Sequence, residues 1–82
     1  MRLSEAQHQE MNILLQFNLS SMQEGIKVHS GADAELVAAT QRLFDKGLIT
    51  LHDGGYLTSL GLKAAEHAQA LKQILSTETT AA

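Results

Sequence analysis

Residues 46–61, KGLITLHDGGYLTSLG, contain the local signals that decide the fold. Gly47 follows a segment with helical periodicity and predicts the end of a helix, because glycine adopts the left-handed conformation found at helix C-termini without steric cost. Two short β-prone runs follow, residues 48–52 and 56–58. Between them lies Asp53-Gly54-Gly55, which is typical of a hairpin turn that requires positive φ angles. The stretch therefore predicts a helix end followed by a two-stranded hairpin.

The N-terminal segment predicts one helix and one short turn. Ser4 and Gln7 have the spacing of an S-x-x-Q capping box, which marks a helix start. The apolar residues of the following MNILLQFNL cover a broad arc, which is typical of a helix that contacts more than one neighbour. After a break in this pattern, SSMQEG predicts a single helical turn. In that turn Ser20 and Gln23 form a second capping box and Gly25 closes it in the left-handed conformation.

A strand and a helix are predicted between this turn and the hairpin. The IKVH of residues 26–29 alternates apolar and polar side chains, as a short half-buried strand does. Asp33 is placed to cap a helix over residues 34–46, whose apolar stripe comprises Leu36, Val37, Thr40, Leu43 and Phe44. Beyond the hairpin, Thr58 or Ser59 caps a last helix.

These elements predict an α+β fold with at most three strands, arranged as one small domain over residues 1–75. A chain of 82 residues fits a single domain, and it buries only about 60–65% of the surface that its unfolded form exposes. The C-terminal STETTAA has no apolar periodicity, so we expect residues 76–82 to form a flexible tail.

The composition is that of an ordinary soluble globule, with 44% hydrophobic and 18% charged residues. The absence of cysteine excludes disulfides and thiolate metal sites, and it is compatible with a reducing cytoplasm. No apolar run approaches the ~18 residues of a membrane span, and the N-terminus is too polar for a signal peptide. We therefore expect a cytoplasmic protein that does not contact membranes.

The segment RLFDKGLITLHDGGYLTSLG resembles the wing region of winged helix-turn-helix proteins. The chain as a whole, especially QEGIKVH, QRLFDKGLI, DGGYLT and AAEHAQAL, is similar to a family of short uncharacterised bacterial proteins with winged-helix or DNA-binding labels. The resemblance covers roughly residues 10–75 and implies a DNA-binding accessory protein or transcriptional regulator. One departure concerns the helix-turn-helix itself. Residues 30–46 leave room for a single helix before the hairpin, so the motif is abbreviated or missing.

If the helix before the hairpin read DNA, its exposed face would lie in the major groove. Gln41 and Arg42 would then contact bases and Lys46 a phosphate, with Lys27 adding a phosphate contact from the strand. The net charge of −3 and two acidic residues on the same helix face oppose this hypothesis. A solvated face of mixed charge is the alternative, and it favours a protein–protein interaction module that has lost the basic surface.

Neither a catalytic site nor a metal site is predicted. The four histidines, His8, His29, His52 and His67, lack the H-x-x-x-H spacing of zinc ligands. Pairing of the predicted strands brings only His29 and His52 near each other. No phosphate-binding loop or nucleophile–base arrangement is present in the sequence. We expect a protein that is not an enzyme and has no cofactor.

The last helix predicts a homodimer interface. One face of this helix collects the side chains Leu60, Ala64, His67, Ala68, Leu71, Ile74 and Leu75. This face spans about four turns and is longer than one small core requires. The alternative is that the helix packs wholly within its own monomer against Leu14, Phe17 and Leu43. Leu62 points away from the face and suggests a second apolar contact.

Overall fold

A computed structural model describes residues 2–21 and 23–77 of the chain. In chain order its elements are α1 (Glu5–Leu14), β1 (Ile26–Lys27), α2 (Ala34–Asp45), β2 (Ile49–Leu51), β3 (Gly54–Leu57) and α3 (Ser59–Leu75). The predicted α+β class and the order helix, strand, helix, hairpin, helix are confirmed. In the part of the chain that the model describes, no helix has the length and apolar character needed to cross a membrane.

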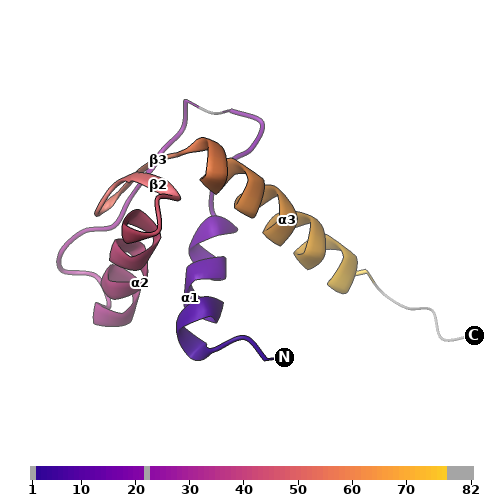
Figure 1. Cartoon of the computed structure of the whole chain (residues 1–82), viewed down its shortest axis with the longest axis horizontal. Helices are drawn as coiled ribbons and strands as arrows, with labels where there is room; N and C mark the ends of the chain where they lie inside the picture. The colour runs from indigo at the N-terminus through magenta and orange to yellow at the C-terminus, as the bar shows by residue number, and fades with distance from the viewer. Residues whose placement is uncertain (1, 22, 78–82) are drawn as a thin grey trace, which may run out of the picture.

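The three helices and the small sheet surround a single core. α1 lies between α2 and α3 and contacts both, while the β2–β3 hairpin joins α2 to α3 at one end of the molecule (Figure 1). α3 begins over this body and then runs away from it, so that its C-terminal half protrudes (Figure 1). The domain is accordingly elongated, with extents of 47 × 27 × 23 Å.

The helix boundaries follow the predicted caps. Ser4 Oγ accepts a hydrogen bond from the Gln7 backbone N–H at 3.0 Å, and Gln7 Oε1 accepts from the Ser4 N–H at 2.9 Å, which confirms the capping box. Asp33 accepts from the backbone N–H two residues on, and Thr58 from the N–H three residues on. Gly47 has a φ of 79° just after α2, as predicted for a C-terminal glycine.

The predicted hairpin is present, but its turn lies earlier than the glycine pair. The turn is formed by His52 and Asp53, whereas Gly54 and Gly55 are the first residues of β3. β3 is the central strand of the antiparallel order β1-β3-β2, and both glycines pair with β1. A Cβ atom on Gly54 would lie 2.3 Å from the Ile26 carbonyl oxygen. A Cβ atom on Gly55 would instead meet the Thr50 and Leu51 side chains of β2. The two glycines are therefore required by the close approach of β1 and β2 as well as by their φ angles of 135° and 76°.

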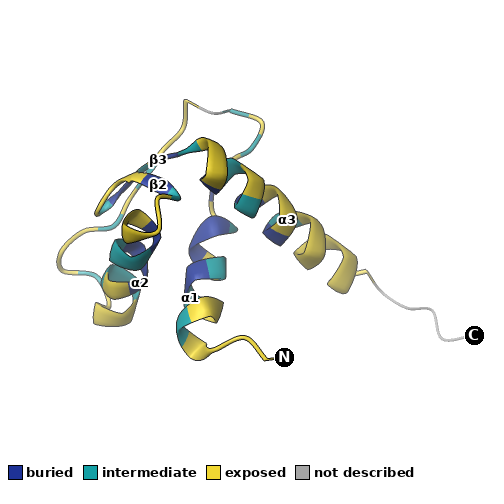
Figure 2. Cartoon of the chain, viewed as in Figure 1, coloured by how far each residue is buried: buried dark blue, intermediate teal, exposed yellow. Residues whose placement is uncertain are grey.

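The core lies where the three helices meet the inner face of the sheet (Figure 2). Its buried hydrophobic members are Ile13, Leu14, Phe17, Ala39, Leu43, Ile49, Leu57, Ala65 and Ala68. The prediction that Phe44 belongs to this core is wrong, because Phe44 is 39% exposed. Its ring packs edge-on against the His52 ring, with 6.5 Å between the two ring centroids. Ala39 takes the buried position on α2 instead, since the helix is rotated toward α1.

The segment between α1 and β1 differs from the predicted helical turn. Its described residues form hydrogen-bonded turns without a helix, and Gly25 does not have a positive φ angle. The side chain of Asn18 organises this segment. Its Oδ1 accepts from the Ser20 N–H at 2.9 Å, and its Nδ2 donates to Glu24 Oε2 at 2.7 Å. Residue 22, in the predicted turn, and residues 78–82, in the predicted tail, lie outside the described residues.

Candidate functional site

The two cations predicted to contact DNA from the helix before the hairpin are bound within the protein. Arg42 Nε donates to Glu10 Oε2 at 2.8 Å, and Lys46 Nζ donates to Glu10 Oε1. The Arg42 guanidinium also donates to the Ala6 carbonyl and to Gln9 Oε1, each at 3.4 Å. Arg42 and Lys46 therefore attach α2 to α1 through both oxygens of one carboxylate.

Glu10 is the buried centre of this Arg42–Glu10–Lys46 cluster. Its side chain is 8% exposed, against 34% for Arg42 and 50% for Lys46. Burial by itself raises the pKa of Glu10, but the hydrogen bonds and positive charges of Lys46 and Arg42 outweigh burial and hold that pKa below its ordinary value. The carboxylate is thus ionised at neutral pH and cancels much of the positive potential that a phosphate would meet here.

Sequence reasoning missed Glu10, although one signal was available. Glu10 precedes Ile13 and Leu14 by three and four residues, so it lies on the buried face of α1. A carboxylate is almost never buried unless it is paired. An acidic residue on an apolar face therefore indicates cationic partners, but the sequence does not say which ones.

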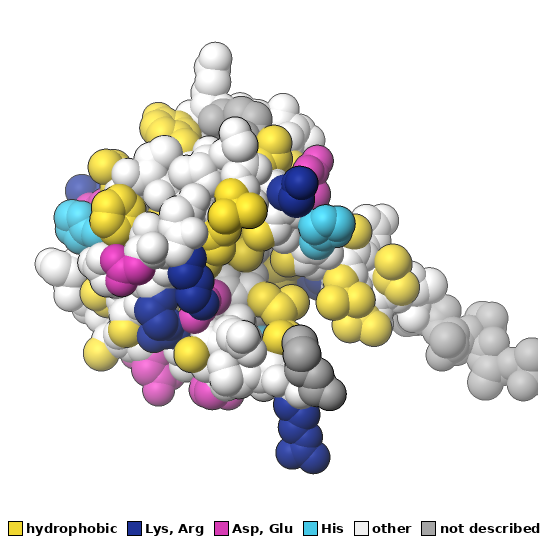
Figure 3. Space-filling view, viewed as in Figure 1, with side chains coloured by type: hydrophobic (Ala, Val, Ile, Leu, Met, Phe, Trp, Pro, Cys, Tyr) yellow, Lys and Arg dark blue, Asp and Glu magenta, His cyan; other side chains and the backbone are white. Residues whose placement is uncertain are grey.

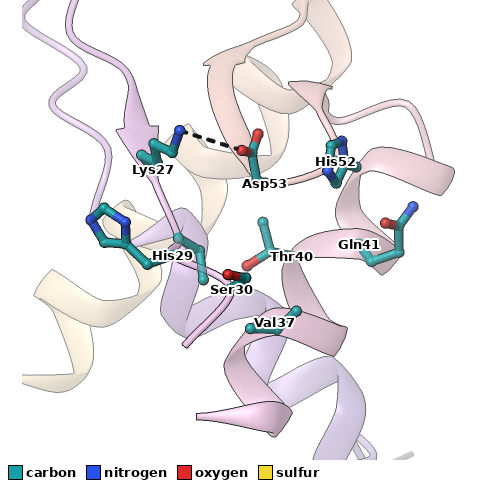
Figure 4. Close-up of a pocket in the computed structure, with 9 residues that line it drawn as sticks. Lys27, His29, Ser30, Val37, Thr40, Gln41, His52 and Asp53 are labelled. Carbon is teal, nitrogen blue, oxygen red and sulfur yellow. Dashed lines mark ion pairs between the residues drawn. The ribbon is translucent and has the colours of Figure 1, made fainter. Parts of the chain in front are cut away.

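The other two residues predicted to bind nucleic acid lie elsewhere. Gln41 Nε2 donates to Asp45 Oδ1 at 3.0 Å along α2, and Lys27 Nζ lies 3.9 Å from Asp53 Oδ2. Both line a cavity of about 320 Å³ between α2, the end of β1 and the hairpin turn (Figure 4). Arg42 and Lys46 instead face α1, where they bind Glu10. The four residues therefore do not form one continuous basic surface.

This cavity also contains the predicted histidine pair. His29 lies two residues after β1 and His52 lies in the hairpin turn. Their rings are well apart, at opposite sides of the opening (Figure 4). The remaining lining residues are Val28, Ser30, Val37, Thr40 and Asp53. The Thr40 hydroxyl is occupied, because it donates to the Leu36 carbonyl at 2.7 Å. Within residues 2–21 and 23–77, no three histidine or acidic side chains are grouped so that they could hold a metal ion.

The predicted dimer face of α3 divides into a buried part and an exposed part. Ala68 is buried together with Gly61 and Ala65, so its place in a dimer interface is corrected to the monomer core. Leu62 packs against this core, which confirms that it makes a separate apolar contact. What remains is a row that we name the α3 stripe, formed by the exposed residues Leu60, His67, Leu71, Ile74 and Leu75 and by the partly buried Ala64, which also packs against the core.

The α3 stripe presents four large aliphatic side chains to solvent. Its members fall within an arc of about 100° on the helix, beside the arc that faces the core. Leu60, Leu71, Ile74 and Leu75 are 56%, 45%, 68% and 74% exposed. The last turns of α3 are exposed all round, and hydrophobic side chains cover their visible face (Figures 2 and 3). The prediction that the whole helix packs inside its monomer is therefore wrong for the protruding half.

A match to a protein-family model shows which family the chain belongs to. A model of a family of unknown function, DUF5669, matches residues 1–76. The chain belongs to the DUF5669 family. Comparisons with curated proteins and with solved structures give no match. The match confirms that the chain belongs to a family without an assigned function, whereas the winged-helix and DNA-binding labels stay predictions. Any function for this DUF5669 protein has to be inferred from its own surface.

Proposed function

We propose that this DUF5669 protein is a cytoplasmic protein–protein interaction module, not an enzyme, and that the α3 stripe is its contact surface. The observation that carries this proposal is the exposure of four large aliphatic side chains on one side of a protruding helix. The largest contiguous apolar patch on a monomeric soluble protein is typically about 300–600 Å², and it is often the functional surface.

The scaffold of this module is, in our proposal, related to the winged helix. The chain has the helix, the hairpin and the following helix of that architecture in the same order, with one strand before them. Only α2 lies between β1 and β2, so the proposed scaffold has a single helix at the place of the helix-turn-helix. Such a scaffold retains a core and a hairpin, which are sufficient to hold α3 with its stripe facing the solvent.

DNA binding stays a prediction that rests on the sequence resemblance. The geometry favours the interaction module, because Arg42 and Lys46 share the Glu10 carboxylate and Lys27 lies beside Asp53. A phosphate contact would have to compete with each of these acids, and affinity for DNA depends on the number of cations free to pair with phosphate.

Photocrosslinking tests the proposed surface. A photoreactive amino acid at position 74, in the full chain expressed in cells, is expected to form a defined covalent adduct. Ile74 lies on the stripe, and its side chain is 68% exposed, so the substitution does not disturb the core. Denaturing electrophoresis and mass spectrometry then give the mass and the identity of the adduct.

The matched control places the same group at Glu66, an exposed residue of α3 that lies about 130° around the helix from the centre of the stripe. We expect no defined adduct from position 66. Equal crosslinking from both positions, or none from position 74, would contradict the proposed contact surface.

A further inference from the structure

The α3 stripe has a symmetric spacing that fits a second copy of itself. Leu60 and Leu75 lie at equal distances from the midpoint between residues 67 and 68, and so do Ala64 and Leu71. When two α3 helices lie antiparallel and share this midpoint, each Leu60 faces the partner's Leu75. Each Ala64 then faces the partner's Leu71, so that a small side chain meets a large one and the two helices can approach closely.

The chemistry of the stripe also matches a copy of itself. None of its six residues is Lys, Arg, Asp or Glu. Two stripes in contact therefore bury mainly aliphatic side chains, with the His67 imidazole beside the midpoint, and place no Lys, Arg, Asp or Glu in the interface. A closed two-fold pair uses the same patch on both subunits, which is the commonest form of homo-oligomer.

The area of the stripe indicates a weak dimer. Its four large aliphatic side chains, which are half to three-quarters exposed, offer on the order of 100 Å² of apolar surface each. Two copies would together bury on the order of 800 Å² of it, which is below the ~1,200–2,000 Å² of stable specific interfaces. Because the interface is this small, we expect the dimer to dissociate at low protein concentration.

We infer that the occupant of the α3 stripe is a second copy of this chain, bound with the two α3 helices antiparallel. This inference rests on the proposed function and names its partner. It can fail while the stripe still serves a different protein.

Introduced cysteines test the antiparallel pairing, because the natural chain has none. One variant carries Leu60→Cys and another carries Leu75→Cys. Under mild oxidation we expect a mixture of the two to form a covalent dimer, while each variant alone stays monomeric on a denaturing gel. In the antiparallel pair the two copies of position 75 lie about 22 Å apart along the helix axis, at about 1.5 Å per residue. A disulfide requires Cα atoms within about 7 Å.

Crosslinking of each variant alone would indicate a parallel pair and overturn the inference. No crosslinking in the mixture would overturn it as well.

Light scattering measures the same association without new covalent bonds. We expect the natural chain to show a mass near twice its 8.9 kDa at high micromolar concentration. On dilution this mass should fall toward that of a single chain. Ile74→Glu is expected to give the single-chain mass throughout, because dimerisation would bury its charge. Gln73→Glu adds the same charge at the neighbouring exposed position outside the stripe and is expected to behave like the natural chain.

A mass of one chain for the natural protein at every concentration would overturn the inference. If the crosslinker at position 74 still captured a different protein in cells, the proposed function would stand with another partner. If it captured nothing, both would fail.

Discussion

Replacing Gly61 by alanine is expected to destabilise this domain strongly. A Cβ atom at position 61 would lie 1.8 Å from the carbonyl oxygen of Leu48 and 3.2 Å from Leu57 Cδ2. The first turn of α3 therefore packs directly against the backbone that follows α2. An added Cβ atom can be accommodated only if one of these two helices moves. Inserting atoms into such a packed site costs about 3 kcal/mol. We expect the melting temperature, measured by circular dichroism, to fall by about 12–24 °C for a domain of this size.

Gly31→Ala is the matched control. A Cβ atom there would have no neighbour within 4 Å, and Gly31 does not have a positive φ angle. The free energy of unfolding of the Gly31→Ala variant is expected to stay within about 0.5 kcal/mol of that of the natural chain. If Gly61→Ala melted at the natural temperature, the close contact between α3 and Leu48 would not exist.

Glu10→Gln is expected to weaken the attachment of α1 to α2. The substitution keeps the shape of the side chain but removes the negative charge shared by Arg42 and Lys46. Hydrogen bonds to charged groups contribute about 1.5–3 kcal/mol each when well formed, and the partial exposure of both cations reduces this to about 1–2 kcal/mol in total. Urea titration of both proteins at pH 7 measures the loss in the free energy of unfolding.

The difference in the free energy of unfolding between the natural chain and Glu10→Gln depends on pH. The pKa of Glu10 is lower in the folded chain than its ordinary 4.5, so the unfolded chain binds the proton first. The stabilising contribution is therefore complete above about pH 4.5 and is lost as the pH falls through the folded-state pKa. The difference in stability between the natural chain and Glu10→Gln should accordingly shrink toward zero as the pH falls from above 4.5 through the lower folded-state pKa of Glu10.

Glu66→Gln serves as the control for removing one carboxylate from a helix. Glu66 is exposed, and no hydrogen bond or salt bridge of its side chain lies within the described residues. We expect a change below about 0.5 kcal/mol. An equal effect of Glu10→Gln and Glu66→Gln, or a difference that does not vary with pH, would contradict the role assigned to the Arg42–Glu10–Lys46 cluster.

The features that the sequence predicted well depend on neighbouring residues. Ser4, Asp33 and Thr58 cap helices because each side chain reaches backbone N–H groups two or three residues away. Gly47 ends α2 for a similarly local reason. Strand and hairpin were predicted from short apolar alternation bounded by glycine, which is again a local pattern.

The features that it missed depend on residues far apart in the chain. Glu10 meets Arg42 and Lys46 across 32 and 36 residues, so no local pattern could name the partners. Gly54 and Gly55 looked like turn residues because only the packing of β1 against Gly54 and of β2 against Gly55 shows why the strand needs them. The rotation of α2 that buries Ala39 and exposes Phe44 is likewise set by α1 and not by the helix alone.

The face of α3 was predicted too broadly for a related reason. Helical periodicity groups Ala68 with Leu71 and Leu75, but it does not say which edge of a wide apolar arc meets the core. The structure turns Gly61, Ala65 and Ala68 inward, because small residues let α3 lie close to α1 and the hairpin. The larger side chains on the next arc are left outside.

The central claim is that the protein makes its contacts through the α3 stripe while Arg42 and Lys46 serve the fold. Amide nitrogen–proton NMR spectra of the labelled chain, recorded from micromolar to millimolar concentration and then with duplex DNA at low salt, test it most directly. We expect concentration-dependent shifts along the stripe, from Leu60 to Leu75, and none at Glu35, Ala38 or Gln41 on the exposed face of α2. We also expect no shifts on addition of DNA. Unchanged α3 resonances at all concentrations, together with DNA-induced shifts around Arg42 and Lys46, would contradict the claim.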